Sequence, residues 1–279
     1  MYKFGLIGYP LGHSISAVIQ HAGLQYIGLE GSYEAFETKP EDLLERIKFF
    51  KRNDFNGFNI TIPLKTIIYP YLDDIDEKAG IVGCVNTVKI NADKTLAGSN
   101  TDIYGFKSAI PKNIILKGKS AGILGTGGAA RAAVAGLSEL GISHIDFYTR
   151  NIINSNQVLS FLREKFPNIT FSVYQIQHPK NLSNLSILVN ATPIGMRGYM
   201  MDEMPIFIQD IETLPKDAVV YDIIYNPTKT LLLQHAERFG LQTISGLDML
   251  IYQAQKSIEL WTGKAPDVKV MKIAALEAL

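Results

Sequence analysis

The chain has 279 residues with 27 basic and 27 acidic side chains, so its formal net charge is zero. Hydrophobic residues make up 47% of it and charged residues only 19%, which excludes a disordered chain. The balanced charge also excludes the broad basic field of a nucleic-acid binder. At about 150 residues per domain, this length predicts two domains.

A single cysteine, Cys84, excludes an internal disulfide framework and a cysteine-rich zinc site. The histidines show no metal-ligand spacing, so we expect no bound metal; they are His13, His21, His144, His178 and His235. The first apolar stretch, residues 4–8, is too short for a signal peptide, and no window reaches the roughly 18 apolar residues of a membrane span. We therefore expect a cytoplasmic protein with neither a membrane nor a nucleic-acid partner.

The first third of the chain predicts short strands that alternate with helices, which is typical of an α/β fold. Strands are expected at 4–8, 32–37 and 58–62, and helices at 17–27 and from Pro40 onward. The third strand alternates strictly, with Phe58, Ile60 and Ile62 on one face, until Pro63 ends it. Further helices are expected before Gly83 and after Asp102.

From residue 119 the pattern changes to that of a mononucleotide-binding domain. Strands are expected at 120–124, 144–149, 170–174, 185–189 and 218–224, and helices at 132–140 and 154–166. The last part predicts two helices, 247–261 and 268–279, which we expect to pack back on the first region. The predicted domains are therefore residues 1–105 with 240–279, and an inserted Rossmann domain at 106–239.

A glycine-rich turn follows the first strand of this inserted domain. The spacing Gly125-x-Gly127-x-x-Ala130 provides a tight turn, a close approach to a pyrophosphate and close helix–strand packing. The helix that follows offers backbone N–H groups and a positive dipole end to phosphates. This context favours a dinucleotide site over a purely structural turn.

The end of the next strand indicates which dinucleotide is bound. An acidic residue there would accept a hydrogen bond from the 2′-hydroxyl of NAD, but this chain has Thr149 and Arg150. A guanidinium suits a 2′-phosphate, whereas Asp146 comes too early, in mid-strand. NADP is therefore favoured over NAD, the alternative being that Arg150 is a solvated loop residue.

Hydroxyl, amide and charged side chains gather at the strand ends of the first region, where open α/β sheets bind ligands. They are Ser14, Ser16, Asn59, Thr61, Lys65, Asn86 and Asp102. Each one alone has an ordinary structural explanation, such as a helix cap or a turn. Together they indicate a site for a polyhydroxylated substrate.

Seven motifs in order resemble those of the shikimate dehydrogenase family and span residues 4–254. They read GYPLGHSIS, FNITIPLK, GCVNT, GSNTDIYG, NATPIGM, DIIYNP and GLDMLIYQA. The resemblance implies NADP-dependent, reversible reduction of 3-dehydroshikimate to shikimate, a step of aromatic amino-acid (chorismate) biosynthesis. It also implies a monomer or homodimer with a substrate-binding domain and a Rossmann NADP-binding domain.

The resemblance assigns roles residue by residue. Lys65 and Asp102 resemble the catalytic pair, and both also contact substrate. The other substrate contacts it implies are Ser14, Ser16, Thr61, Asn86, Tyr225 and Gln253. The cofactor contacts it implies are Gly125, Thr126, Gly127, Gly128, Ala129, Thr149, Arg150, Ile223, Gly246, Met249 and Glu77.

The chain departs from the family pattern at three places. Ala17 replaces a proline, Cys84 replaces a small alanine, and only one cation, Arg150, stands in the adenosine loop. None of these changes removes a catalytic polar group.

In the reductive direction, Lys65 as an ammonium can hydrogen-bond the developing alkoxide and donate a proton, while Asp102 holds it in place. The Asp102 charge favours the ammonium and burial favours the neutral amine, so the sequence leaves the protonation state open.

Three other functions compete with this interpretation. The first is an NAD-dependent quinate/shikimate dehydrogenase. The second is another enzyme of similar architecture, such as a methylenetetrahydrofolate dehydrogenase or a glutamyl-tRNA reductase. The third is a non-catalytic nucleotide sensor, which would be expected to lack Lys65 or Asp102.

Overall fold

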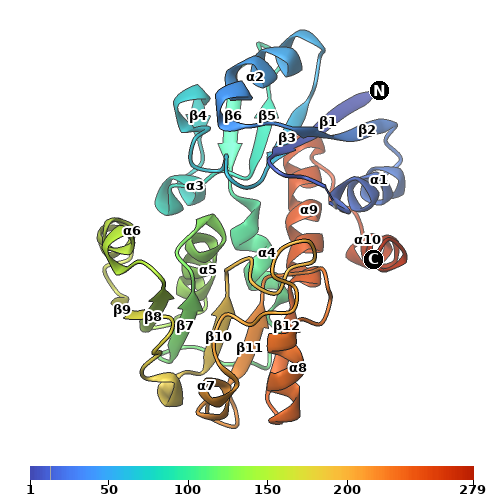
Figure 1. Ribbon diagram of the computed structural model, residues 1–279. Coiled ribbons are helices and arrows are strands. Elements are labelled where there is room, and N and C mark those ends of the chain that lie inside the picture. The colour runs from blue at the N-terminus through green and yellow to red at the C-terminus, as the bar shows by residue number, and fades with distance from the viewer. Residues whose placement is uncertain (13) are drawn as a thin grey trace. The chain divides into compact units, whose positions relative to one another are not determined.

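The computed structural model describes residues 1–12 and 14–279, without the side chain of Asn154; His13 lies outside the described residues. The chain forms two compact units (Figure 1). Unit 1 comprises Met1–Gly105 and Ile251–Leu279, and unit 2 comprises Phe106–Leu250. Each unit carries a six-stranded sheet with helices packed on it, so the expected α/β fold is confirmed.

Unit 1 is built on a mixed sheet with the strand order β2-β1-β3-β5-β6-β4. Strands β2, β1 and β3 run parallel, whereas β5 runs antiparallel to both β3 and β6. The strands are β1 (Tyr2–Gly8), β2 (Gly31–Glu37), β3 (Gly57–Ile60), β4 (Asp74–Ile75), β5 (Thr87–Ile90) and β6 (Leu96–Ser99). Its α-helices are α1 (Ser16–Tyr26), α2 (Leu43–Arg52), α3 (Glu77–Val82) and α10 (Val268–Glu277). It also contains residues 101–105 of α4 (Thr101–Ala109) and 251–262 of α9 (Gly246–Thr262), whose other residues belong to unit 2.

Alternate residues of β3 point to opposite faces of this sheet. Phe58 and Ile60 pack with Ile47 and Phe50 of α2 in one hydrophobic core. Asn59 points to the opposite face, where it meets Gln20 of α1 and Ser257 of α9. The period of two predicted from the sequence therefore holds up to Ile60.

The prediction for Ile62 is wrong. Strand β3 ends at Ile60, and Ile62 is 65% exposed instead of joining Phe58 in the core. Residues 62–68 form turns, in which the Leu64 amide donates to the Thr61 carbonyl. This early end of the strand carries Lys65 away from the sheet into a loop.

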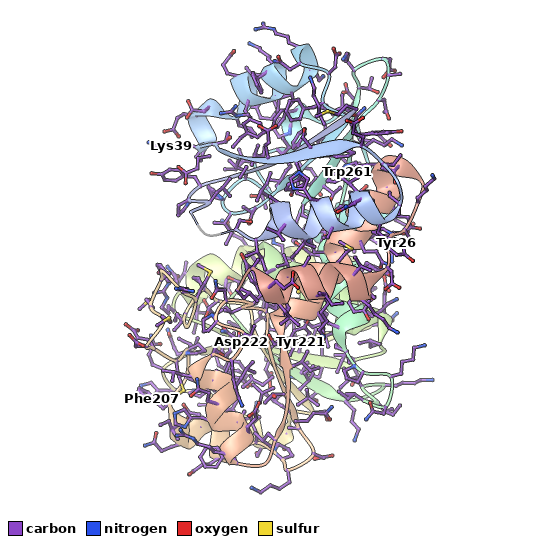
Figure 2. The ribbon with its side chains drawn as sticks, turned by 90° about the vertical axis from the view of Figure 1, so that its right-hand side faces the viewer. Tyr26, Lys39, Phe207, Tyr221, Asp222 and Trp261 are labelled. Carbon is purple, nitrogen blue, oxygen red and sulfur yellow. The ribbon has the colours of Figure 1, made fainter. Side chains whose placement is uncertain are left out.

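The side chain of Trp261 packs α9 against the sheet of unit 1 (Figure 2). Its Nε1 donates to the Val88 carbonyl at 2.9 Å, and its ring stacks on Phe4 at 4.4 Å between centroids. The ring is buried at 5% exposure, so an α9 residue one turn earlier, Ser257, is held over the same strands. The predicted packing of the last helices on the first region is thus explained.

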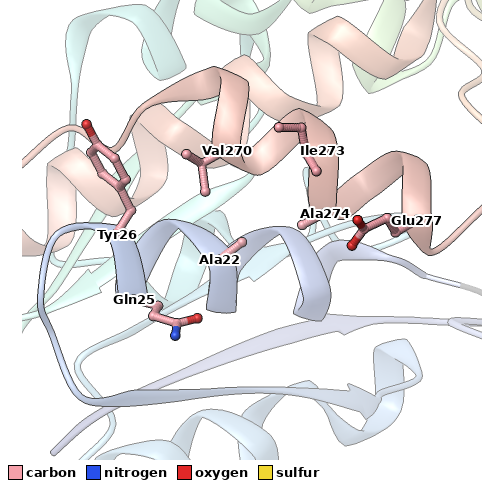
Figure 3. Close-up of a pocket in the computed structure, with 7 residues that line it drawn as sticks. All are labelled: Ala22, Gln25, Tyr26, Val270, Ile273, Ala274 and Glu277. Carbon is pink, nitrogen blue, oxygen red and sulfur yellow. The ribbon is translucent and has the colours of Figure 1, made fainter.

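Helix α10 packs beside α1, and a groove of about 350 Å³ lies between them (Figure 3). Its lining is mostly apolar and comes from these two helices: Ala22, Gln25, Tyr26, Val270, Ile273, Ala274 and Glu277. None of the polar residues singled out in the sequence lines it. The groove is therefore separate from the candidate site.

Unit 2 is built on a wholly parallel sheet with the order β12-β11-β10-β7-β8-β9. This is the doubly wound order, in which the strand order reverses beside the first strand. The strands are β7 (Ser120–Leu124), β8 (His144–Thr149), β9 (Thr170–Gln175), β10 (Ile187–Asn190), β11 (Val219–Asp222) and β12 (Gln242–Ser245). The α-helices between them are α5 (Gly128–Glu139), α6 (Ile152–Lys165), α7 (Ile208–Glu212) and α8 (Leu231–Arg238).

Three elements of unit 2 were not predicted, helices α7 and α8 and strand β12. Because β12 pairs with β11, residues 242–245 belong to this sheet, and the unit ends at Leu250 instead of residue 239. Helix α7 and strand β12 are only five and four residues long and give weak periodic signals. Helix α8 has three buried apolar residues, Leu232, Leu233 and Ala236, and its pattern was readable in the sequence.

In the part of the chain that the structure describes, none of the helices combines the length and apolar character that crossing a bilayer requires.

Candidate active site

Polar side chains meet at one edge of the unit 1 sheet because of the strand directions. Strands β1 and β3 end at this edge, the antiparallel β5 begins there, and β6 ends there. Lys65 follows β3, Asn86 precedes β5, and Asp102 follows β6 in the first turn of α4. The mixed sheet thereby brings together three side chains that are far apart in sequence.

Lys65 and Asp102 form a partly buried ion pair. The Lys65 Nζ donates to Asp102 Oδ2 at 2.6 Å, and the two side chains are 16% and 8% exposed. The other carboxylate oxygen, Oδ1, accepts from Asn86 Nδ2 at 2.8 Å. Each oxygen of the carboxylate thus has its own donor, which fixes the orientation of the pair.

The surroundings of Lys65 keep it charged. Burial favours the neutral amine, but the Asp102 carboxylate, Cys84 and the hydrogen bond to Asp102 together outweigh burial. The pKa of Lys65 is therefore raised above its ordinary value. The side chain is an ammonium at neutral pH, a point that the sequence left open.

Gln253 of α9 joins this group. Its Oε1 accepts from Asn86 Nδ2 and from Thr101 Oγ1, both at 3.4 Å. We name Lys65, Asn86, Asp102 and Gln253 the polar site of unit 1. It combines a cation, an anion and two amides, which suits a substrate that carries several hydroxyl groups.

Ser14, Ser16 and Thr61 belong to neighbouring loops of the same sheet edge. Ser14 Oγ donates to Ser16 Oγ at 3.0 Å, at the start of α1. The Thr61 amide donates to the Ile7 carbonyl at 2.8 Å, which ties the end of β3 to β1. All three side chains are half-buried, so they retain access to a ligand.

Two predicted residues belong to a different unit from the rest of their groups. Tyr225, a predicted substrate contact, belongs to unit 2, in the loop that follows β11. Glu77, a predicted cofactor contact, begins α3 in unit 1 and is exposed. The remaining cofactor candidates all belong to unit 2.

The glycine-rich turn of unit 2 has the conformation that its composition predicts. Gly125 has φ 94°, and a Cβ there would lie 3.2 Å from the Ala191 carbonyl oxygen. Gly127 precedes α5 with no side-chain cap, and no atom lies within 4 Å of the place where its Cβ would stand. There is therefore open space beside Gly127, just before α5, whose first N–H groups have no partner within the helix.

The residue that follows β8 is a cation, Arg150, and β8 pairs with the strand that leads into the glycine-rich turn. Arg150 is exposed, and Thr149 is buried with its Oγ1 accepting from the Asn151 amide and from Ser155 Oγ. Asp146 is in mid-strand, where its carboxylate pairs with His144 at 2.7 Å. No carboxylate of β8 therefore stands where a ribose 2′-hydroxyl is normally bound.

Close packing joins the ends of β11 and β12 to α9. A Cβ at Gly246 would lie 1.9 Å from the Ile223 carbonyl oxygen, so only glycine fits there. The Ile223 amide donates to the Asn190 carbonyl at 3.0 Å, and Met249 is buried at 5% exposure. Ile223 and Gly246 are thus in close contact, and Met249 is buried three residues further along α9.

Sequence reasoning missed a buried network at the same strand ends. Asp222 is fully buried in unit 2 (Figure 2), and its carboxylate accepts from Thr230, Asn190 and the Ile224 amide. Burial raises the pKa of Asp222 to about 6, although these hydrogen bonds oppose the shift. The sequence signal for this network was a single polar residue at the end of each of two buried strands, Asn190 in β10 and Asp222 in β11.

The sequence patterns also gave no sign of the buried hydroxyl groups around Asn86, which belong to Thr87, Thr101 and Ser257. Such residues in a buried strand or helix give no distinctive sequence signal. Among the described residues, no group of three or more histidine, cysteine, aspartate or glutamate side chains is placed to hold a metal ion.

Comparison with known proteins adds two family matches. Residues 6–88 match the model of the shikimate dehydrogenase substrate binding domain, and residues 246–276 match that of the shikimate 5′-dehydrogenase C-terminal domain. A shikimate dehydrogenase (NADP(+)) of Methanococcus aeolicus is 38% identical over 278 residues, 99% of this chain and 97% of that protein.

Solved structures agree over the full length. A shikimate dehydrogenase in complex with NADP+ has a TM-score of 0.90 and 37% identity, covering 99% of this chain and 95% of that chain. The Thermus thermophilus shikimate 5-dehydrogenase with NADP(H) and shikimate has a TM-score of 0.86, 34% identity and 100% coverage of both chains. A Corynebacterium glutamicum quinate dehydrogenase with NAD has a TM-score of 0.88 and 28% identity, with 99% of each chain covered.

Proposed function

The chain belongs to the shikimate dehydrogenase family, and we propose that it catalyses the NADP-dependent, reversible reduction of 3-dehydroshikimate to shikimate. The observation that carries this proposal is the polar site of unit 1. There the Lys65 ammonium is held 2.6 Å from a carboxylate whose other oxygen is bound by Asn86. A charged donor fixed in this way suits proton transfer to a carbonyl oxygen.

The chemistry of the reductive direction follows from this geometry. NADPH, when bound, supplies a hydride to the ring carbonyl carbon. Lys65 donates a hydrogen bond to the carbonyl oxygen, stabilises the negative charge that develops there, and transfers its proton to that oxygen. Asp102 keeps Lys65 charged and oriented, and Lys65 regains a proton from solvent. In the oxidative direction the neutral Lys65 amine accepts the hydroxyl proton.

The residues of unit 2 fit NADP. The open space at Gly127 and the start of α5, which has no side-chain cap, suit a pyrophosphate, and the exposed Arg150 suits a 2′-phosphate. We propose the turn Gly125–Ala129, with Thr126 and Gly128 in it, as the pyrophosphate site. Thr149 shapes the loop of Arg150, while Ile223, Gly246 and Met249 shape the opposite end of the cofactor site.

The substrate contacts are also a proposal. Asn86 and Gln253 suit the ring hydroxyls because their amides lie beside the Lys65–Asp102 pair. Ser14, Ser16 and Thr61 suit the substrate carboxylate because their hydroxyls are half-buried donors at the same sheet edge. Tyr225 and Glu77 are assigned on the family resemblance, Tyr225 to the substrate and Glu77 to the cofactor.

The proposal is tested by following NADPH or NADH absorbance with the purified chain. Shikimate and quinate are each assayed with NADP and with NAD. We expect kcat/KM to be highest for shikimate with NADP. Turnover of quinate with NAD, without turnover of shikimate with NADP, would assign the chain to catabolic quinate oxidation instead; no turnover of either would leave only a nucleotide-binding role.

We further propose that the enzyme acts in the cytoplasm, since its single cysteine, the buried Cys84, suits a reducing compartment. Its state in solution, monomer or homodimer, is measurable by light scattering.

A further inference from the structure

Three buried hydroxyls from three different elements surround the Asn86 amide. They belong to Thr87 of β5, Thr101 of α4 and Ser257 of α9, each no more than 1% exposed. Thr87 Oγ1 lies 2.9 Å from Ser257 Oγ and 3.1 Å from Thr101 Oγ1, and the latter two oxygens are 3.2 Å apart. We name these three residues the hydroxyl triangle.

The neighbours of the triangle decide where its protons point. Ser257 Oγ donates to the Gln253 carbonyl at 2.9 Å, so it acts as an acceptor toward the rest of the cluster. Asn59 Nδ2 donates to Thr87 Oγ1 at 2.9 Å and to Ser257 Oγ at 3.0 Å. With these acceptor positions filled, the Thr87 hydroxyl is available to donate to Asn86 Oδ1.

The Asn86 amide has one orientation that satisfies these groups. Its Oδ1 accepts from the Thr101 backbone amide at 2.7 Å and from the Thr87 hydroxyl at 3.1 Å, and its Nδ2 donates to Thr101 Oγ1 at 3.0 Å. Its Nδ2 is therefore directed to Asp102 Oδ1 at 2.8 Å. A reversed amide would place an oxygen against the Asp102 carboxylate and an NH₂ group against the Thr101 backbone N–H.

We propose that Thr87 and Ser257 are positioning residues of the reaction, because they hold the Asn86 amide in the orientation that fixes Asp102 and, through it, Lys65. This role rests on the proposed function. Ser257 acts on a second member of the polar site as well, since it binds the Gln253 carbonyl one helical turn before its own position.

A purely structural role makes a different prediction. Buried hydroxyls that only satisfy one another can be replaced by apolar groups of the same shape at little cost. Under a purely structural role, such a replacement would change the thermal unfolding midpoint only slightly and would leave kcat unaltered. A positioning role predicts that kcat falls even in a variant that remains folded.

Thr87→Val and Thr87→Ser separate the two roles. Thr87→Val removes the hydroxyl and keeps the shape, whereas Thr87→Ser keeps the hydroxyl. We expect kcat for shikimate oxidation to fall at least about 10-fold in Thr87→Val, with the KM for NADP within about twofold of the wild type. Thr87→Ser should stay within about threefold of the wild-type kcat, and Ser257→Ala should lose kcat in the same direction as Thr87→Val.

The matched control is Thr262→Val on the same helix. Thr262 Oγ1 donates to the Ile258 carbonyl at 2.7 Å, as Ser257 does to Gln253, but it lies outside the hydroxyl triangle. Thermal unfolding midpoints are measured for all variants. A wild-type kcat in Thr87→Val, or an equal loss of kcat in Thr262→Val, would overturn the positioning role proposed for Thr87 and Ser257.

Ser257→Ala keeps the inference testable if Thr87→Val does not fold, since a wild-type kcat in Ser257→Ala would also overturn it. The wild-type assay distinguishes the two proposals. A wild-type chain without turnover overturns the proposed function and this role together, whereas an active wild type with an active Thr87→Val overturns this role alone.

Discussion

Lys65 is the residue on which turnover should depend most strongly. Replacing it by alanine removes the ammonium that stabilises the developing alkoxide and supplies its proton. We expect kcat to fall about 10²–10⁴-fold in Lys65→Ala, with a much smaller change in the KM for shikimate. Steady-state kinetics test this, with Lys48→Ala as the control because Lys48 forms only an exposed pair with Glu45. A near-normal kcat in Lys65→Ala would remove Lys65 from the chemistry.

Arg150 should determine the preference for NADP. Its loss removes a charge-assisted hydrogen bond to the 2′-phosphate, so we expect the KM for NADP to rise about 10- to 100-fold in Arg150→Ala. The KM for NAD should stay nearly constant, since NAD lacks that phosphate. Arg238, an exposed arginine of α8, provides the control variant Arg238→Ala. An equal rise of both KM values would show that Arg150 does not recognise the phosphate.

Single residues differ in how far the sequence could identify them. Lys65, Asn86 and Asp102 were predictable because charged and amide groups at strand ends are rarely structural in all three places. Thr87 and Ser257 were not, because their partners are separated by as many as 198 residues, as in the Asn59–Ser257 bond, and only the folded chain joins them. The protonation state of Lys65 also required the structure, since burial and the Asp102 charge act in opposite directions.

At the scale of elements, the contact between β11 and α9 permits no side chain at Gly246. An alanine Cβ would meet the Ile223 carbonyl oxygen at 1.9 Å, so the backbone must move. We expect Gly246→Ala to cost about 2–3 kcal/mol of stability, seen as a lower thermal unfolding midpoint. Gly80→Ala in α3 is the control, because no atom lies within 4 Å of that Cβ position. Equal midpoints for both variants would contradict this packing argument.

Asp222, which joins the loop after β11 to Thr230, should make stability depend on pH. The pKa of this carboxyl is about 6 in the folded chain, against about 3.9 in an unfolded one. Its contribution to stability is therefore complete below about pH 4 and is lost as the pH rises through about 6, by up to about 3 kcal/mol. An asparagine keeps the acceptor for Asn190 and donates to Thr230 Oγ1, so Asp222→Asn should remove this pH dependence.

Denaturant unfolding of the wild type and Asp222→Asn between about pH 4 and pH 7 measures this effect. The free energy of unfolding of the wild type should fall relative to that of the variant as the pH rises. Parallel curves for the two proteins would show that Asp222 does not titrate in this range.

Element prediction succeeded where the apolar pattern was strong and failed where it was weak. The strands β7 and β8 are continuous buried runs, and their predicted bounds hold. Strand β12 has only one buried residue, Ile244, and was missed. Strand β3 is shorter than its alternating pattern predicts because the turns that begin at Thr61 interrupt the ladder.

At the scale of the whole molecule, alternating strands and helices were sufficient to predict an α/β fold in two parts. They did not predict that the unit 1 sheet is mixed, since strand direction depends on pairing between distant segments. That antiparallel β5 is what brings Asn86 to the same edge as Lys65 and Asp102. The chemistry thus depends on a topological feature that periodicity alone does not reveal.

The central claim is that a hydride passes from NADPH to the ring ketone of 3-dehydroshikimate. It is tested most directly by incubating the enzyme with 3-dehydroshikimate and NADPH deuterated at both C4 positions of the nicotinamide, followed by mass spectrometry of the product. The account predicts shikimate that is one mass unit heavier, with the deuterium on the carbon that bears the new hydroxyl group. Unlabelled shikimate, or no shikimate at all, would contradict it.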